Sequence, residues 1–385
     1  MKLAIVGVGG AGGKILDRLL EYDADRDAGF TRHAVAVDTA KGDLEGLARV
    51  PDSNRLLVGE SIGGGQGTGA DPAAGRAAVE DDLEEIQSAI DRVATGKIDA
   101  LLVLAGLGGG TGGGGAPLIA ERLGEIHAEP VYGLGILPST DEGGIYSRNA
   151  ARALQRFVEH TDNVLLFDSE AFESRVESVA EIETTIAARF GTLFSAGEAD
   201  AEDGTVAESV VDSSEVVNTL GDRGLSSVGY ATEEVETKGG GLLSRLLGSK
   251  DTEPEFVSAG NATNRITSLA RQATLRKLTL PCEIESASRA LVIVAGPPEH
   301  LDRKGLEEAR RWIEEKTNCQ TVRTGDYPRP DSDRVAVLVL LSGITAVPRI
   351  EEIQTMAAEF ERTAESRDGD ANGNVRDLVE YDDPE

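Results

Sequence analysis

A glycine-rich segment near the start of the sequence has the residue types that bind phosphate. Residues 7–14 read GVGGAGGK and directly follow the apolar run at residues 3–6. A helical pattern begins at Ile15, so the backbone N–H groups at the start of a helix would face a bound anion. The phosphate-binding residues predicted here are Gly9, Gly10, Ala11, Gly12, Gly13 and Lys14.

Taken alone, the same segment fits a dinucleotide-binding pattern. Gly7, Gly9 and Gly12 satisfy GxGxxG. Asp38 ends the second expected strand, where an acid would bind ribose. An NAD-dependent oxidoreductase is therefore one alternative, although the sequence offers no obvious catalytic histidine or Tyr-Lys pair for it.

A second glycine cluster favours a nucleoside triphosphate instead. Residues 106–115 read GLGGGTGGGG, between the apolar run 101–105 and a helix opened by Pro117. Glycine is costly in backbone entropy, so this density indicates a conformation that other residues cannot adopt rather than a linker. The second cradle would bind terminal phosphates, and a Walker-type loop is excluded because GxxxxGK[ST] does not occur. The predicted donors are Gly108, Gly109, Gly110, Thr111 and Gly112.

Around these segments, short apolar runs alternate with helical patterns. The expected strands are residues 2–6, 34–37, 56–58, 101–104, 131–137 and 164–167. This alternation predicts an α/β fold, a parallel sheet with helices on both faces, whose ligands bind at the carboxyl ends of the strands. A helix is predicted over residues 72–93, and a long connecting helix over residues 174–194. The apolar stripe of the connecting helix consists of Val179, Ile182, Ile186, Phe190 and Leu193.

The second half of the chain predicts a smaller α+β domain. Its expected elements are helices at residues 264–275 and 303–315, strands at 290–295 and 335–341, and a last helix from Pro348. Charge clusters and a glycine triplet at residues 231–262 predict a long mobile insertion. The acidic residues 366–385 predict a disordered tail. The expected division is a nucleotide-binding domain at 1–173, a connecting helix at 174–196, a loop at 197–220 and a C-terminal domain at 221–365.

Composition limits the functional classes. A chain of 385 residues exceeds most single cores, so two domains are expected. The net charge of −30 leaves no basic footprint for nucleic acid, and it suits a salt-rich cytoplasm in which ions screen self-repulsion. We expect a cytoplasmic protein, because no apolar run is long enough to span a bilayer and no signal peptide is evident. The two cysteines and four histidines lack metal-ligand spacing, so no metal ligand is assigned.

Several motifs together resemble the tubulin and FtsZ superfamily. GGGTG at residues 108–112 resembles its signature loop, residues 9–13 its first phosphate loop, and residues 63–76 the third loop of FtsZ. PSTDEG at residues 138–143 resembles the fifth loop, whose glutamate, here Glu142, touches the ribose. LGILPSTDEGGIY, AESVVDSSEVVNTL and LVIVAGPPEHLDRKG strongly resemble the archaeal CetZ proteins. The resemblance implies a GTPase that binds GTP and GDP, self-assembly into head-to-tail protofilaments, and a role in cell shape rather than constriction.

The resemblance also implies a catalytic pair. In this superfamily the lower face of one subunit closes the nucleotide pocket of the next, and the family's two acids fall at Asp212 and Glu215. Their i, i+3 spacing places both carboxylates on one face of a helix start, where they could orient the attacking water. Phosphoryl transfer usually also uses Mg²⁺. The alternative is a capping pair that stabilises the helix start and does no chemistry.

Base recognition departs from the family pattern. The family's base-stacking aromatic aligns with Val179, and Ser169 replaces an asparagine. Tyr146 lies near the sequence position at which FtsZ carries an arginine. Glu183 occupies a position where relatives have Asn or Asp, so its carboxylate could accept two hydrogen bonds from guanine. The alternative for Glu183 is an ordinary solvated side chain. These departures leave a non-hydrolysing filament regulator or scaffold as an alternative function, and the acidic tail could recruit partner proteins.

Overall fold

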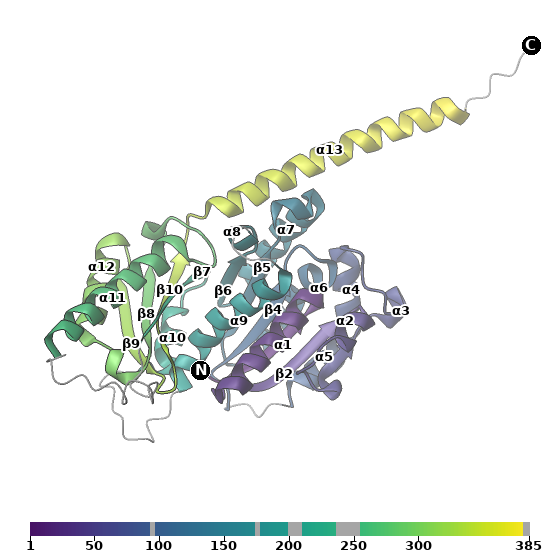
Figure 1. The fold of residues 1–385 in the computed structure, drawn as a ribbon. Coiled ribbons are helices and arrows are strands. Elements are labelled where there is room, and N and C mark those ends of the chain that lie inside the picture. The colour runs from purple at the N-terminus through teal and green to yellow at the C-terminus, as the bar shows by residue number, and fades with distance from the viewer. Residues whose placement is uncertain (93–96, 174–177, 199–209, 236–254, 380–385) are drawn as a thin grey trace, which may run out of the picture.

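The computed structural model describes residues 1–92, 97–173, 178–198, 210–235 and 255–379. Six parallel strands form the N-terminal part of its central sheet (Figure 1). They are β1 (Leu3–Val8), β2 (Thr31–Asp38), β3 (Arg55–Leu57), β4 (Ala100–Gly106), β5 (Val131–Leu137) and β6 (Asn163–Asp168). Every neighbouring pair in the spatial order β3-β2-β1-β4-β5-β6 is parallel. The strands and the parallel sheet predicted from the sequence are confirmed.

Both faces of this sheet are buried, which explains why its strands read as unbroken apolar runs. Along β1, Ala4, Val6 and Val8 belong to one core, whereas Leu3 and Ile5 belong to the other. Successive side chains of a strand point to opposite faces, so a strand between two cores needs apolar residues at every position.

Helices cover each face of the sheet. One core contains residues of α1 (Gly9–Arg26), α2 (Lys41–Glu45), α9 (Val179–Ser195) and α10 (Ser213–Thr219). The other contains residues of α4 (Pro72–Asp81), α5 (Leu83–Ile90), α6 (Gly110–Ile126), α7 (Gly144–His160), α11 (Glu255–Arg276), α12 (Arg303–Lys316) and α13 (Pro348–Val379). The short helices α3 (Glu60–Gly63) and α8 (Glu170–Glu173) lie in connections between these elements. Within the described ranges, no helix combines the length and apolar character needed to cross a membrane.

The sheet continues without a break into the C-terminal half of the chain. Its further strands are β7 (Leu225–Glu234), β8 (Arg289–Gly296), β9 (Thr321–Pro328) and β10 (Arg334–Ile344). β7 pairs parallel with β6, β10 lies antiparallel between β7 and β8, and β9 pairs parallel with β8. At the junction, the Ser226 hydroxyl is 2.6 Å from Asn163 Oδ1 and 2.9 Å from the Ser342 hydroxyl, which joins three neighbouring strands.

One predicted helix is divided in the structure, and another begins later than predicted. The predicted helix 72–93 is divided into α4 and α5 at Asp82, where the backbone leaves helical geometry (φ −108°, ψ 19°) and the carboxylate accepts a 2.7 Å hydrogen bond from the Gly59 N–H. The connecting helix α9 begins at Val179, because the Ser178 hydroxyl caps it by accepting from the Glu181 N–H. Residues 174–177 lie outside the described residues.

The predicted insertion and tail also differ from the structure. β7 continues to Glu234 and α11 begins at Glu255, so the predicted insertion, residues 231–262, wrongly included residues of both elements. Residues 236–254, with the glycine triplet, lie outside the described residues. α13 continues to Val379, where composition predicted disorder from residue 366. No proline occurs between Pro348 and Pro384, so no residue of that stretch lacks a backbone donor. Figure 1 shows α13 extending well past the rest of the molecule.

Candidate nucleotide-binding site

A cavity of about 610 Å³ lies where β1, β4, β5 and β6 end at their carboxyl termini. This volume is within the range of small-molecule sites. The cavity lies where a ligand of a parallel sheet is expected to bind. Most of the predicted binding residues line it. They are Gly9, Gly10, Ala11, Lys14, Asp38, Gly108, Gly109, Gly110, Thr111, Gly112, Glu142, Ser169 and Glu183.

Gly12 and Gly13 do not line the cavity, because they face Leu104 and Leu47 instead. Helix α1 begins at Gly9 rather than at Ile15, where the sequence predicted its start. Gly12 instead lets α1 lie against the sheet: a Cβ there would be 2.4 Å from the Leu104 carbonyl oxygen. Gly9 has a φ of +73° and a Cβ on it would lie 2.9 Å from the Gly112 nitrogen, so the two glycine clusters are in direct contact.

The second glycine cluster is largely helical. α6 begins at Gly110 and contains Pro117, which the sequence placed at the start of the helix. The glycines allow α4 to approach: a Cβ on Gly75 would lie 2.2 Å from the Gly110 carbonyl oxygen, and one on Gly114 would lie 2.0 Å from the Pro72 carbonyl oxygen. The run of glycines is therefore a helix packing surface as well as part of the cavity lining.

A third loop, residues 64–71, lines the cavity beside the two glycine clusters. Positive φ angles occur at Gly64, Gly65, Gly67, Gly69 and Ala70, a backbone that glycine adopts at little cost. The loop is held by Asn149 of α7, which is buried: its Nδ2 donates to the carbonyl oxygens of Ala70 (2.9 Å) and Gly108 (3.0 Å). Sequence reasoning identified this loop by resemblance but missed Asn149, because a lone asparagine in a helix has no distinguishing pattern.

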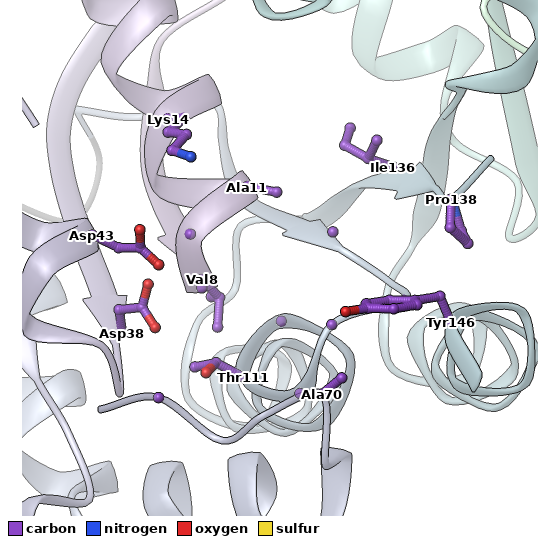
Figure 2. A pocket seen from close by; sticks show the side chains of 18 of the residues that line it. Val8, Ala11, Lys14, Asp38, Asp43, Ala70, Thr111, Ile136, Pro138 and Tyr146 are labelled. Atoms are coloured by element: carbon purple, nitrogen blue, oxygen red, sulfur yellow. The ribbon is translucent and has the colours of Figure 1, made fainter. Parts of the chain in front are cut away.

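Two aspartates turn toward one another beside the start of α1 (Figure 2). Asp38 is buried, and its Oδ1 accepts hydrogen bonds from the N–H groups of Thr39 (2.7 Å) and Ala40 (3.2 Å). Burial raises the pKa of Asp38 to about 6, and the charge of Asp43 acts in the same direction. The Thr39 and Thr111 hydroxyls are 2.7 Å apart. Asp38 thus lies beside Thr111 of the second glycine cluster.

The other end of the cavity is formed by loops 138–142 and 168–170 and the start of α9. Glu142 Oε1 accepts from the Ser139 N–H at 2.9 Å within a capping box. Val179 is 68% exposed at the rim, so it is not part of the buried stripe that the sequence predicted for this helix. The Glu183 side chain is 15% exposed and lies 3.6 Å from the Arg18 guanidinium, so it is not an ordinary solvated glutamate.

Asp212 and Glu215 lie away from the cavity of their own chain. α10 directly precedes β7, whose Leu225 pairs with Val164 near the first residue of β6. This places both acids at the amino end of the parallel strands, opposite the cavity. Asp212 caps α10 by accepting from the Ser214 N–H (3.2 Å), and Glu215 Oε2 is 2.7 Å from Arg323 Nη1. No group of three or more possible metal ligands occurs in the described part of the chain.

Comparison with known proteins agrees with this geometry. Residues 2–176 match the profile "Tubulin/FtsZ family, GTPase domain", and residues 173–359 match "Tubulin-like CetZ, C-terminal domain". The tubulin-like protein CetZ1 of Haloferax volcanii is 54% identical over 373 residues, which cover 95% of this chain and 94% of that protein.

Two solved structures are similar over nearly the whole chain. A GDP bound monomer of CetZ1 from Haloferax volcanii gives a TM-score of 0.82 at 50% identity, covering 94% of this chain and 100% of that chain. A GTPgS bound protofilament of CetZ2 from Haloferax volcanii gives a TM-score of 0.82 at 39% identity, covering 95% of this chain and 100% of that chain. The chain therefore belongs to the CetZ family of tubulin-like proteins, within the tubulin and FtsZ superfamily.

Proposed function

We propose that this protein binds GTP, assembles head to tail into protofilaments, and hydrolyses GTP at the interface between subunits to control cell shape in the cytoplasm. The observation that carries the proposal is the separation of two half-sites. The cavity lined by the glycine clusters lies at the carboxyl end of the parallel sheet, and the acids Asp212 and Glu215 lie at its amino end. Translation of one copy onto the next would bring the two halves together.

The cavity accounts for the orientation of the nucleotide. The triphosphate would lie over the N-terminal turns of α1 and α6, where backbone N–H groups converge on an anion. The ribose would then face Glu142, and the base would reach Ser169 and Glu183 at the start of α9. A carboxylate at Glu183 can accept from both N1–H and the exocyclic amine of guanine, whereas adenine presents an acceptor at N1.

Asp38 and Asp43 fit a magnesium ion bound together with the phosphates. Mg²⁺ takes oxygen ligands and is commonly held by one or two carboxylates plus substrate phosphates. Two carboxylates held close together beside the phosphate loops provide such ligands. Bound there, the ion would neutralise charge on the phosphates during transfer.

Hydrolysis would use the acids of the adjoining copy. Glu215 would accept a proton from the attacking water while the water oxygen forms a bond to the terminal phosphorus. The bond from that phosphorus to the GDP oxygen would break. Asp212 would help to orient the water. Positioned acids of this kind contribute about 10²-fold to 10⁴-fold, and cradle N–H groups would stabilise the transferring phosphoryl group.

One observation favours a non-hydrolysing filament protein as a second candidate. Asp212 is engaged as a helix cap and Glu215 is engaged by Arg323, so both acids have structural partners. A filament that binds GTP without using these acids would act as a scaffold or regulator of other filaments.

Sedimentation and turnover assays separate these functions. We expect the wild-type protein to pellet with GTP and Mg²⁺, to remain soluble with a chelator, and to show GTPase activity per molecule that rises with protein concentration. Assembly without turnover would identify the scaffold. Constant activity per molecule in dilute protein would contradict a site shared between subunits.

A further inference from the structure

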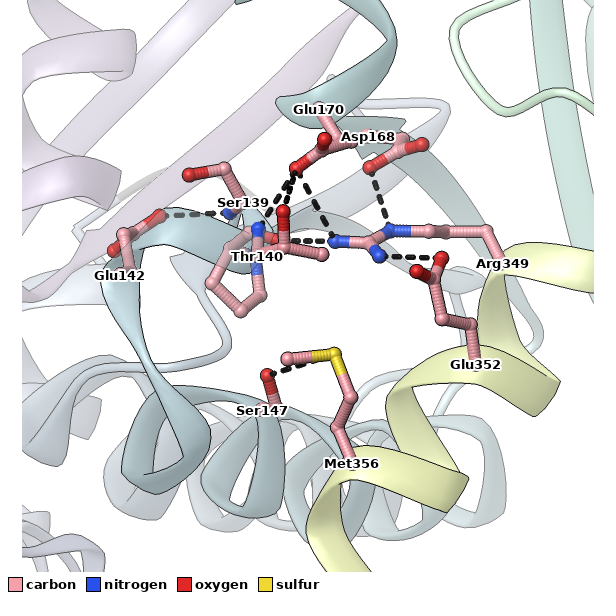
Figure 3. Close-up of polar contacts among 10 residues, drawn as sticks. Ser139, Thr140, Glu142, Ser147, Asp168, Glu170, Arg349, Glu352 and Met356 are labelled. Carbon is pink, nitrogen blue, oxygen red and sulfur yellow. Dashed lines mark hydrogen bonds and ion pairs between the residues drawn. The ribbon is translucent and has the colours of Figure 1, made fainter.

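The guanidinium of Arg349 joins the C-terminal helix to two loops of the nucleotide-binding domain (Figure 3). Arg349, near the start of α13, is buried. Its Nε donates to Asp168 Oδ1 at 3.2 Å, its Nη2 donates to the Pro138 carbonyl oxygen at 2.8 Å, and its Nη1 donates to Glu352 Oε2 at 2.7 Å. Glu170 Oε2 lies 4.0 Å from the same Nη2.

The partners of Arg349 adjoin the base and ribose end of the cavity. Pro138 lines the cavity, and Asp168 immediately precedes Ser169, which also lines it. Glu170 ties the two loops together, because its Oε2 accepts from both the N–H (2.7 Å) and the hydroxyl (2.9 Å) of Thr140. One side chain of α13 thus fixes both loops, although the described residues of α13 contribute nothing to the cavity lining.

A second set of contacts docks α13 on α7. A Cβ on Gly144 would lie 2.7 Å from the Phe360 ring, and the Arg148 guanidinium lies 5.4 Å from the centre of that ring. Arg152 and Glu361 form an exposed ion pair at 2.7 Å. The Arg152–Glu361 pair connects the two helices without involving a residue of loops 138–142 or 168–170. It therefore provides a matched comparison for Arg349.

We propose that Arg349 is a positioning residue through which the docked helix α13 sets loops 138–142 and 168–170 for nucleotide binding. This inference rests on the proposed function of the cavity. An arginine suits the role because its planar fork reaches several acceptors at fixed angles, which a lysine ammonium cannot do. Removal of the guanidinium would leave the buried Asp168 carboxyl without its cationic partner, and both loops would lose their common anchor.

Arg349→Gln, Arg349→Lys and the control Arg152→Gln in the full-length protein test this inference. We expect Arg349→Gln to weaken GDP binding at least tenfold in calorimetry, about 1.4 kcal/mol, with a smaller loss for Arg349→Lys. Arg152→Gln removes a contact between α7 and α13 and should leave GDP affinity unchanged. Hydrogen exchange of the nucleotide-free protein should be faster at residues 138–142 in Arg349→Gln alone, with α6 unchanged.

Wild-type GDP affinity and wild-type exchange at residues 138–142 in a folded Arg349→Gln protein would overturn the inference. An equal loss of GDP affinity in Arg152→Gln would also overturn it, because helix docking in general would then be responsible. If Arg349→Gln does not fold, Arg349→Lys is compared with Glu352→Gln, which keeps the contacts to Asp168 and Pro138. Only the lysine variant should lose affinity, and equal affinities would reject the proposal. Failure of the wild-type protein to bind GDP would reject the proposed function instead, and the exchange measurement would still test Arg349.

Discussion

The carboxylate of Glu215 forms an ion pair with Arg323, with 2.7 Å between Oε2 and Nη1, at the end of the sheet opposite the nucleotide cavity. Both side chains are about one-third exposed, so the pair can open toward an adjoining subunit. Exposed pairs of this kind contribute only about 0–1 kcal/mol to stability. The proposed catalytic role and the structural role of Glu215 can therefore be separated by experiment.

Glu215→Gln tests the catalytic role. The substitution keeps the shape of the side chain but removes its basicity, so we expect GTP turnover in assembled protein to fall about 10²-fold to 10⁴-fold. GTP affinity and sedimentation with GTP should persist, because the cavity of the same chain is not altered. Phosphate release from pelleted filaments measures the effect.

Asp222→Asn is the matched control for Glu215→Gln. Asp222 lies at the same end of the sheet and is also paired with an arginine, Arg289, at 2.7 Å. GTP turnover by Asp222→Asn should match that of the wild type. Unchanged turnover in Glu215→Gln, or an equal decrease in Asp222→Asn, would exclude Glu215 as the base.

The close approach of α4 and α6 gives a prediction about packing. Gly75→Ala would place a Cβ 2.2 Å from the Gly110 carbonyl oxygen and 2.9 Å from the Thr111 Cα. The helices must separate, at a cost of about 1–3 kcal/mol in the free energy of unfolding. Because Gly110 and Thr111 line the cavity, GDP affinity should fall as well.

Gly42→Ala is the control for this packing effect. Gly42 lies in helix α2, and nothing lies within 4 Å of a Cβ placed on it. Its substitution should raise stability by about 0.5–1 kcal/mol, because alanine loses less backbone entropy in a helix. Urea denaturation and GDP titration of both variants measure these effects. Wild-type stability in Gly75→Ala would show that the two helices can separate without cost.

Local patterns in the sequence were enough to predict the parallel sheet and most of the cavity lining. The apolar strands are continuous because two cores enclose them, and the glycine clusters stand where those strands end. The start of α6 was predicted too late, at Pro117, because glycine has a low helix propensity. Packing against α4 overrides that propensity, and it depends on Gly75, which is distant in the sequence.

Residues that act through distant partners could not be predicted. Arg349 is 181 positions from Asp168, and Asn149 is 79 positions from Ala70. Neither residue belongs to a motif, and a buried arginine cannot be distinguished from an exposed one by residue type alone. Asp43 was missed for the same reason, since a single acid after a strand has no special spacing.

The raised pKa of Asp38 predicts a pH dependence. Its pKa of about 6 in the folded protein exceeds the ordinary value of 3.8, so the folded state holds this proton more tightly than the unfolded state. Protonated Asp38 therefore adds its full contribution to the free energy of unfolding below about pH 4, and this contribution is lost as the pH rises through about 6. The whole contribution is about 3 kcal/mol. Ionised Asp38 would also repel the phosphates when Mg²⁺ is absent.

Asp38→Asn isolates this effect from the titration of the nucleotide itself. Without Mg²⁺, GDP affinity of the wild type should decrease from pH 5 to 7 more steeply than that of Asp38→Asn, by up to about tenfold per pH unit. Calorimetry at several pH values measures both curves. Parallel curves would show that Asp38 does not titrate in this range.

Guanine selectivity can be tested at Glu183, which is held near the cavity by Arg18 at 3.6 Å. In Glu183→Gln, one acceptor is replaced by an amide donor that opposes a donor of guanine, so an unpaired polar group results. The ratio of GTP to ATP affinity should fall at least tenfold, about 1.4 kcal/mol.

Glu21→Gln is the control, because Glu21 also contacts Arg18, at 2.9 Å, but is not among the residues that line the cavity. Competition of GTP and ATP for a fluorescent GDP analogue measures the ratio. If both variants keep the wild-type ratio, Glu183 does not read the base. If Glu21→Gln lowers it equally, the Arg18 charge, not the Glu183 carboxylate, sets selectivity.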